Sequence, residues 1–426
     1  MRKNIGILLI ILCCIGAIVL WLPSAQGSGI SFRSFSQIAA LIGIILLSIN
    51  FILSTRLKFL EGFFGGLNQV YIIHHVVGIT ALLFLLVHPV LIAIYYWKIS
   101  LAAAFDVIFP SPISGFATWF GMGALLTLIL LLVLTLYVKL PYNLWKLTHK
   151  FMGIALILAT IHVLFISSTV SNNYPLRYYI LSFCTIGLIS YLYRTLLGRF
   201  FVKRVRYKVD KIKIVENVTA IILFPLAKKL KYLPGQFIFI KFASLGITSE
   251  EHPFSLTSTP DEEVISIAAK SSGDYTETLK LLKEDSIATI EGPFGRFSFV
   301  EARRKKQIWI AGGIGITPFL SMAKSFTKDN GYEATLYYVV KVHKEAIFLS
   351  LLHQCSQNSP NLKVVPFYTK TAGHLTANIV AQDIPDFATH DIFICGPKPM
   401  MTSLRTQFNN LGVRNGHIFS EEFSLD

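Results

Sequence analysis

Residues 68–91 read NQVYIIHHVVGITALLFLLVHPVL, and residues 144–165 read LWKLTHKFMGIALILATIHVLF. The first stretch holds His74 and His88, fourteen residues apart, and the second holds His149 and His162, thirteen apart. Because an α-helix repeats about every 3.6 residues, each spacing returns a side chain to nearly the same face, about 20 Å further along the axis. Both stretches are also apolar and long enough to cross a hydrocarbon layer.

Two such helices, placed side by side, offer two facing pairs of imidazoles at two depths. Two stacked, six-coordinate haems need this arrangement. A polar imidazole inside a bilayer is costly, so an intramembrane histidine indicates function. A hydrogen-bonded core histidine is the better explanation for any one of the four, but a poor one for four at matched depths. His75 lies thirteen residues from His88 and is an alternative to His74.

The composition places a membrane domain before the soluble part. The chain has 426 residues, of which 53% are hydrophobic and 15% charged, and the apolar residues concentrate in the first half. Six stretches are long enough to span a bilayer, at residues 5–22, 37–53, 70–97, 116–138, 151–168 and 178–197. The first follows Met1-Arg2-Lys3 and is similar to a signal peptide, with WLPSAQG as a cleavage region. We expect an uncleaved anchor, because the following spans need an even count.

The formal charge of +15 would suit a nucleic-acid partner, but the positions of the cations argue against one. One set of span ends carries Arg2, Lys3, Arg56, Lys58, Lys139, Lys146, Lys150, Arg194, Arg199, Lys203 and Arg204. The opposite ends carry Arg33, Lys98 and Arg177. This is the positive-inside pattern. It predicts a multi-pass protein of the cell membrane with both termini in the cytoplasm.

The five cysteines, Cys13, Cys14, Cys184, Cys355 and Cys395, form no Cys-x-x-Cys pair. Their spacing predicts neither a disulfide framework nor a zinc site. Cys-x-x-Cys-His is absent as well, so a haem in this chain is not attached through that motif.

The soluble half divides by strand pattern. Residues 201–302 alternate in short β-type runs broken by turn signals such as Leu233-Pro234-Gly235 and Gly292-Pro293, which predicts an antiparallel β-barrel. In residues 303–426 strands alternate with helices, which predicts a doubly wound α/β domain. With a six-helix transmembrane bundle at 1–200, the expected fold is a multi-domain membrane protein of three parts.

The barrel region contains His252-Pro253-Phe254-Ser255-Leu256-Thr257-Ser258, preceded by Pro234-Gly235-Gln236-Phe237 and followed by Lys270-Ser271-Ser272-Gly273-Asp274-Tyr275-Thr276 and Gly292-Pro293-Phe294-Gly295. In this order the four elements resemble the flavin domain of the ferredoxin–NADP reductase superfamily. His252 stands where an arginine often opens the motif, as is typical of ferric reductases and NADPH oxidases.

The resemblance implies an FAD site in the barrel. It places Phe254 against the flavin ring or ribityl chain and the Ser255 hydroxyl at flavin N5. Gly273 then lets backbone N–H groups approach the pyrophosphate, and Thr276 adds a hydroxyl at a helix start. The remaining FAD-binding residues are expected to be His252, Pro253 and Lys270.

A second motif, Ile308-Trp309-Ile310-Ala311-Gly312-Gly313-Ile314-Gly315-Ile316-Thr317-Pro318, runs from a strand through a glycine-rich turn into a helix that begins with proline. Free N–H groups and the helix dipole there suit the diphosphate of a nucleotide. We expect Gly312, Gly313, Gly315 and Thr317 to bind it.

In the reductase family Cys395-Gly396-Pro397 borders the nicotinamide, and Lys341 stands where a cation contacts the 2′-phosphate of NADPH, with Lys344 as a second candidate. NADH remains the alternative donor. Phe423 matches the aromatic residue that covers the flavin ring near the C-terminus, where the alternative is an apolar plug. The resemblance thus makes Ser255, Cys395 and Phe423 the residues nearest the hydride transfer.

The membrane half resembles the ferric-reductase-like transmembrane domain, through LEGFFGGLNQVYIIHH and WKLTHK. With the soluble half, nearly the whole chain is similar to prokaryotic NADPH oxidase-like proteins. This implies that His74 and His149 ligate the haem nearer the cytoplasm and His88 and His162 the outer haem, both of b type.

The implied activity moves electrons from cytoplasmic NADPH through FAD and two haems to an external acceptor. O2 would give superoxide, and an Fe(III) chelate would give Fe(II). An extracytoplasmic partner protein or a quinone as acceptor, or a non-catalytic haem sensor, are the alternatives. Arg33, Lys98 and Arg177 are expected near the outer face, as loop cations or as partners of haem propionates or anionic acceptors.

Overall fold

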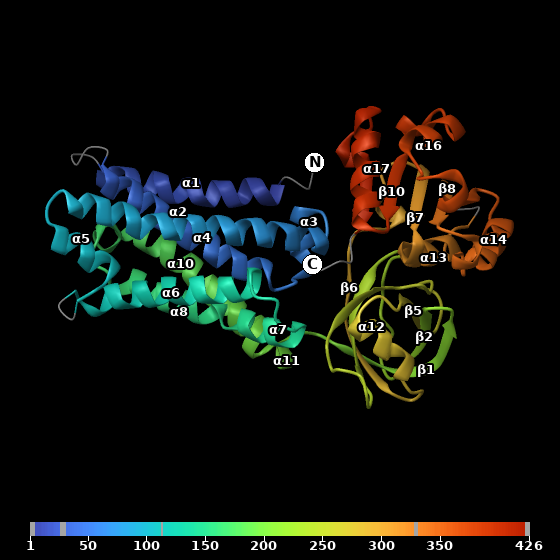
Figure 1. The fold of residues 1–426 in the computed structure, drawn as a ribbon, viewed down its shortest axis with the longest axis horizontal. Helices are drawn as coiled ribbons and strands as arrows, with labels where there is room; N and C mark the ends of the chain where they lie inside the picture. The colour runs from blue at the N-terminus through green and yellow to red at the C-terminus, as the bar shows by residue number, and fades with distance from the viewer. Residues whose placement is uncertain (1–4, 26–30, 112–113, 328–330, 422–426) are drawn as a thin grey trace. The chain divides into compact units, whose positions relative to one another are not determined.

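The computed structural model describes residues 5–25, 31–111, 114–327 and 331–421. It divides into two compact units, Met1–Val202 and Lys203–Asp426. The first unit is helical and the second contains two β-sheets (Figure 1).

The first unit is a bundle of long apolar helices that run side by side (Figure 1). Its elements are α1 (Ile5–Ala25), α2 (Phe32–Leu53), α3 (Lys58–Phe64), α4 (Leu67–Trp97), α5 (Leu101–Ile108), α6 (Phe116–Leu136), α7 (Tyr142–Lys150), α8 (Met152–Phe165), α9 (Thr169–Asn172), α10 (Tyr174–Tyr191), the π-helical turn η2 (Leu192–Leu196) and α11 (Gly198–Phe201). Six segments of the described chain are long and apolar enough to cross a membrane.

Helix α2 is the centre of this bundle. Within its span 61% of the residues are buried, against at most 28% in the other five segments. It packs against α4, α10 and α1, while α6 packs against α8. The side chains of α4, α6 and α8 that face away from the bundle are therefore largely apolar and exposed, as expected for contact with lipid.

The predicted second, fifth and sixth spans had wrong boundaries. The second was expected to begin at residue 37, but its helix begins at Phe32. The fifth was expected at residues 151–168, but its helix begins at Tyr142 and ends at Phe165, with a break between α7 and α8 at Phe151. The sixth begins at Tyr174, where Asn173 caps the helix by accepting from the Leu176 N–H. Lys146 and Lys150 lower the hydropathy of the α7 segment, so a prediction from hydropathy alone starts the fifth span too late in the sequence.

The second unit begins with a six-stranded antiparallel sheet that closes into a barrel. Its strands are β1 (Val205–Val215), β2 (Val218–Pro225), β3 (Phe237–Ala243), β4 (His252–Ser255), β5 (Ile265–Lys270) and β6 (Ile287–Phe294), in the order β4-β3-β6-β1-β2-β5. A bridge between Leu256 and Ile267 joins the two edges. The short helices α12 (Asp274–Thr278), η3 (Leu279–Leu281) and η4 (Phe299–Glu301) follow β5 and β6.

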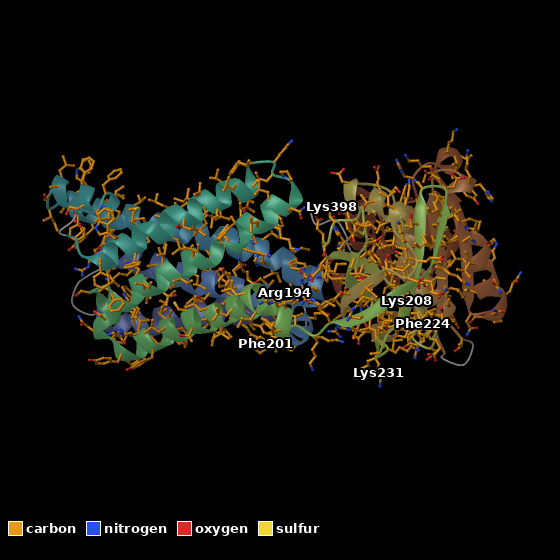
Figure 2. All side chains as sticks on the ribbon, turned by 90° about the horizontal axis from the view of Figure 1, so that it is seen from below. Arg194, Phe201, Lys208, Phe224, Lys231 and Lys398 are labelled. Carbon is orange, nitrogen blue, oxygen red and sulfur yellow. The ribbon has the colours of Figure 1, made fainter. Side chains whose placement is uncertain are left out.

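Side chains alternate across the barrel wall as the period of a β-strand requires. Tyr207 and Val209 of β1 are fully buried in the barrel core, whereas Lys208 between them reaches Asp285 at 2.8 Å. Lys208 pairs across the strands with Phe224 of β2, which is exposed, and the two lie next to each other in Figure 2.

The rest of the second unit is a parallel five-stranded sheet in the order β11-β10-β7-β8-β9. Its elements are β7 (Lys306–Gly312), η5 (Gly313–Ile316), α13 (Thr317–Lys324), β8 (Glu333–Val340), η7 (His343–Glu345), α14 (Leu349–Asn358), β9 (Leu362–Tyr368), α15 (Thr369–Ala372), α16 (Ala377–Asp383), η8 (Phe387–Thr389), β10 (Asp391–Cys395), α17 (Lys398–Asn410), η9 (Asn415–His417) and β11 (Ile418–Glu421).

Helices cover both faces of this sheet, with α13 and α14 on one side and α16 and α17 on the other (Figure 1). Trp309 and Ala311 of β7 face the first pair, and Ile308 and Ile310 face the second. The predicted order of a helical bundle, an antiparallel barrel and a doubly wound sheet is thereby confirmed. The strand order reverses direction at β7, and in such sheets ligands bind where the order reverses.

Candidate redox centres in the two units

The first histidine pair lies between α4 and α7. The ring centroids of His74 and His149 are 6.1 Å apart. That separation leaves room for one metal ion between the rings, given metal–nitrogen bonds of about 2 Å. Trp145 stacks on His149 with centroids 5.4 Å apart and so fixes the plane of that ring. His75 is exposed, and its ring centroid lies 5.9 Å from that of His74.

The second pair is formed by His88 of α4 and His162 of α8. Nδ1 of His88 lies 3.0 Å from the carbonyl oxygen of Ser36 and 2.8 Å from the Ser36 hydroxyl. Nδ1 of His162 lies 2.8 Å from the carbonyl oxygen of Ala117. On α6, a Cβ at Gly121 would lie 2.6 Å from His162 Nδ1, so the glycine provides the space for this ring.

Backbone carbonyls define the tautomer of three of the four imidazoles. In addition to His88 and His162, Nδ1 of His74 lies 3.2 Å from the carbonyl oxygen of Asn50. A carbonyl oxygen can only accept, so each Nδ1 carries the hydrogen and Nε2 keeps its lone pair. Neutral imidazoles held in this way are typical metal ligands. The arrangement fits a haem at each pair.

His88 and His162 both line a cavity of about 470 Å³ inside the bundle. Most of its other walls are apolar side chains of α2, α4, α6 and α8, such as Leu41, Leu85 and Leu128. Its size falls in the range of about 300–1,000 Å³ that is typical of cofactor sites. Within the described ranges, no group of three or more histidine, cysteine, aspartate or glutamate side chains is arranged to hold a metal.

In the barrel, Ser255 ends β4 and is 4% exposed. Its Oγ has no hydrogen-bond partner within the described part of the chain. A buried hydroxyl without a partner costs free energy, which a polar atom of a bound ligand would recover. The residue fits the flavin contact expected from sequence. Phe254, by contrast, packs in the apolar core of the barrel, so its contact with a flavin remains a prediction.

The His252 ring stacks on Tyr275 of α12 at 3.6 Å between centroids, and its Nε2 lies 3.0 Å from Glu250 Oε2. The Tyr275 hydroxyl is buried, which raises its pKa above the usual value. The Thr276 hydroxyl accepts from the N–H groups of Ser272 and Gly273, so it caps α12. Pro253 is half-buried in β4, and Lys270 ends β5.

The two glycine motifs of the nucleotide lobe meet at the switch point of the sheet. A Cβ at Gly315 would overlap the carbonyl group of Cys395 and lie 2.7 Å from the Gly396 nitrogen. A Cβ at Gly396 would lie 2.9 Å from the Gly312 Cα. The three glycines therefore permit the close approach of β7 and β10 that brings the motifs together.

The other residues predicted to bind the nucleotide differ in how accessible they are to a ligand. Gly313 has φ +55° and open space where a Cβ would stand, so a ligand can approach its backbone. Thr317 is buried and its hydroxyl donates to the Ile314 carbonyl, and Pro318 lies in the first turn of α13 as predicted. Pro397 is exposed and directly precedes α17.

Lys341 follows β8 and is exposed, and its N–H donates to Glu345 Oε2 at 3.2 Å. A carboxylate at this position suits a ribose hydroxyl, whereas the lysines suit a phosphate. The position of Phe423 lies outside the described residues.

Sequence reasoning missed a set of contacts that joins the barrel to the nucleotide lobe. Phe237 of β3 pairs with Ser255, and a Cβ at Gly295 would lie 3.0 Å from the Phe237 ring and 2.6 Å from Glu421 Oε1. Glu421 pairs with Cys395 in the β10–β11 register. Burial, with the Glu421 carboxylate nearby, raises the pKa of the Cys395 thiol well above its usual value. Contacts through Phe237, Gly295 and Glu421 thus connect Ser255 in the barrel with Cys395 in the parallel sheet.

Three families match this chain in succession. Residues 39–160 match the ferric reductase like transmembrane component, residues 204–310 an FAD-binding domain and residues 309–406 the oxidoreductase NAD-binding domain.

Among curated proteins, the chain is 26% identical to CDP-6-deoxy-L-threo-D-glycero-4-hexulose-3-dehydrase reductase of Yersinia pseudotuberculosis over 51% of its own length and 68% of that protein. It is 36% identical to NADPH oxidase 3 of Rattus norvegicus, over 26% of this chain and 22% of that protein, and 26% identical to NADPH oxidase 1 of Mus musculus, over 50% and 44%. The chain therefore spans less than half the length of either NADPH oxidase.

Among solved structures, flavohemoglobin from Malassezia yamatoensis is similar in fold, with a TM-score of 0.50, 18% identity and coverage of 79% of this chain and 94% of that one. The order of the matched families agrees with the order of the bundle, the barrel and the parallel sheet. The chain is thus an NAD(P)H-type oxidoreductase that joins a ferric reductase-like transmembrane component to an FAD-binding domain and an NAD-binding domain.

Proposed function

We propose that this chain carries electrons from cytoplasmic NADPH across the cell membrane to an acceptor on the outer side, through FAD and two b-type haems. With O2 as the acceptor, one NADPH and two O2 give NADP+, one proton and two superoxide ions. The observation that carries the proposal is the pair of facing histidine sets on α4 and on α7–α8, three of whose Nδ1 atoms face backbone carbonyls.

When bound, FAD accepts a hydride and releases single electrons, and the haems relay those electrons one at a time. The residues of the chain supply binding, orientation and shielding from water. His74 with His149, and His88 with His162, would hold one iron each, with their Nε2 atoms free to ligate. The close packing between helices keeps each pair aligned.

In the second unit, the Ser255 hydroxyl would contact flavin N5, and Gly312, Gly313 and Gly315 would admit the nucleotide diphosphate at the switch point of the sheet. The neutral Cys395 thiol would lie at the nicotinamide without adding charge. Lys341 and Lys344 favour the 2′-phosphate of NADPH, and Glu345 beside them moderates that preference. The proposed domain limits are 1–200 for haem, 201–302 for FAD and 303–426 for the nucleotide.

The orientation rests on the cations. They concentrate at the bundle ends that α3, α7 and α11 occupy, and the positive-inside rule therefore supports a cytoplasmic side for both termini and the second unit. His74 and His149 then lie nearer the cytoplasm, and His88 and His162 nearer the outside.

With two histidines for each iron, neither metal would keep an open position for a further ligand. The last electron transfer is therefore outer-sphere, and the acceptor is whatever reaches the outer end of the bundle. An Fe(III) chelate is the second candidate acceptor, favoured by the polar cavity at that end. An electron-supply role for an outside partner protein is a weaker alternative, because the chain carries its own FAD- and NAD-binding domains.

The test uses detergent-purified protein with haem, FAD and NADPH. Cytochrome c reduction that superoxide dismutase abolishes would support the oxidase, and faster Fe(III) reduction without oxygen would support the metalloreductase. If the protein consumes NADPH with neither of the two acceptors, the oxidase and the metalloreductase are both contradicted. In haem counts, His88→Ala and His162→Ala should each lose one of two haems, whereas His75→Ala should lose none.

A further inference from the structure

A second, polar cavity of about 320 Å³ lies at the end of the bundle where α2 begins. It is lined by Ser24, Arg33, Ser167, Ser168, Thr169 and Asn172. Arg33, Ser167, Ser168 and Thr169 also line the larger cavity that contains His88 and His162. The two cavities therefore adjoin, and the polar one lies between the histidine pair and the end of the bundle.

Positive charge and hydroxyl groups dominate the walls of the polar cavity. Arg33 is exposed and is the cation that both cavities share. Asp106 lines only the larger cavity. Its Oδ1 accepts from the Ser111 N–H at 2.9 Å and from the Ser114 hydroxyl at 2.7 Å, so these two serines hold the carboxylate. A guanidinium beside several hydroxyl donors matches the geometry and charge of a carboxylate.

The walls are held in place by hydrogen bonds among α1, α2 and α9. Gln37 donates to the Thr169 hydroxyl at 2.9 Å and accepts from the Trp21 indole at 2.9 Å. Arg33 lies one helical turn before Ser36, the residue that contacts His88. A ligand held by Arg33 would thus lie about one turn from the helix contact that positions the outer ligand pair.

We propose that Arg33, with the hydroxyls of Ser167, Ser168 and Thr169, forms a binding site for carboxylate groups beside the His88–His162 cavity. The inference rests on the proposed function and deepens it, since it names the chemistry recognised at the outer end. The carboxylates have two possible sources, the propionates of the porphyrin or an Fe(III) chelate such as Fe(III)-citrate. For the chelate, one NADPH and two Fe(III) give NADP+, one proton and two Fe(II).

The test compares Arg33→Gln and Arg33→Lys with Lys98→Gln, a matched control. Lys98 lies at the same end of the bundle, carries the same charge and lines neither cavity. If the site binds the chelate, Arg33→Gln should raise KM for Fe(III)-citrate about tenfold. The KM for cationic hexaammineruthenium(III) should stay unchanged, Arg33→Lys should recover part of the loss, and iron-free citrate should compete in the wild type.

If the site binds propionates, Arg33→Gln should instead shift the midpoint potential of one haem and weaken its retention, with all acceptors affected alike. Either pattern supports the site. Unchanged KM values and haem potentials in Arg33→Gln, or equal effects in Lys98→Gln, would overturn it. Failure of the proposed function gives a different result, because wild-type protein would then consume no NADPH with any acceptor. In that case the site is still tested by measuring the haem midpoint potential in a dithionite titration of the wild type and of Arg33→Gln.

Discussion

Ser36 and His88 are linked in both directions across the contact between α2 and α4. The Ser36 hydroxyl lies 2.8 Å from His88 Nδ1 and 2.8 Å from the His88 carbonyl oxygen, and His88 Nδ1 is 3.0 Å from the Ser36 carbonyl oxygen. The serine therefore orients the imidazole through its side chain and its backbone at once. Such outer partners hold a metal ligand in its tautomer and raise its basicity.

Ser36→Ala should weaken retention of one haem by about tenfold or more, because loss of an outer hydrogen-bond partner typically costs 10- to 100-fold in metal affinity. The backbone carbonyl remains, so the haem should not be lost completely. The measurement is the haem-to-protein ratio during detergent dialysis. Ser48→Ala, on the same helix and equally buried, is the control, and equal losses in both variants would contradict a specific role for Ser36.

Gly121→Ala should remove the same haem through sterics. The added methyl would lie 2.6 Å from His162 Nδ1, so the ring must move or the helices must separate. At Gly123, two residues along the same helix, a Cβ would meet its nearest atom at 3.7 Å, an ordinary contact. Absorbance spectra of Gly121→Ala should therefore show about half the low-spin haem signal, whereas Gly123→Ala should match the wild type. A full haem complement in Gly121→Ala would refute the steric argument.

Ser255→Ala should slow reduction of the flavin by NADPH by about two- to tenfold, since one hydrogen bond is worth about 0.5–1.5 kcal/mol. Without a flavin the variant should be as stable as the wild type or more so, because it removes a buried hydroxyl that has no partner among the described residues. Stopped-flow absorbance measures the rate and thermal unfolding measures the stability. Thr219→Val, which removes a similarly buried hydroxyl from β2, should leave the rate unchanged.

Cys395 should remain a neutral thiol well past pH 9. Burial raises its pKa above the ordinary value of 9.0 in the folded protein, so the folded state holds this proton more tightly than the unfolded state. The resulting stabilisation is complete below pH 9 and declines as the pH rises through the folded value. Iodoacetamide at pH 8 should therefore leave Cys395 unlabelled in native protein and label it after denaturation, as peptide mass spectrometry would detect. Rapid native labelling would contradict the burial argument.

Much of the fold could be predicted because it follows from local patterns. Long apolar runs identify the six helices, and His74 and His88 fall on the single helix α4, which continues past Pro89. Strand alternation and the glycine motif identify the barrel and the switch point of the parallel sheet. The apolar run does begin at Phe151, but the helix α7 before it was not predicted, since Lys146 and Lys150 interrupt the apolar pattern there.

The partners of the candidate ligands could not be predicted in the same way. Ser36 is 52 residues from His88, and Ala117 is 45 residues from His162. Helix packing decides which of many serines or carbonyls meets an imidazole, and periodicity carries no information on that pairing. The approach of Glu421 to Gly295 likewise depends on how the end of the chain returns to the barrel.

The backbone contacts of His74 and His162 also bear on how this protein tolerates change. Their acceptors are the carbonyl oxygens of Asn50 and Ala117, which every amino acid possesses. Replacing either side chain leaves its oxygen in place, so single codon changes at those two positions cannot delete the anchor. Substitution at Asn50 or Ala117 should therefore leave the ring orientation of His74 or His162 unchanged. Substitution of Ser36 should not do so for His88, because the Ser36 hydroxyl itself contacts that ring.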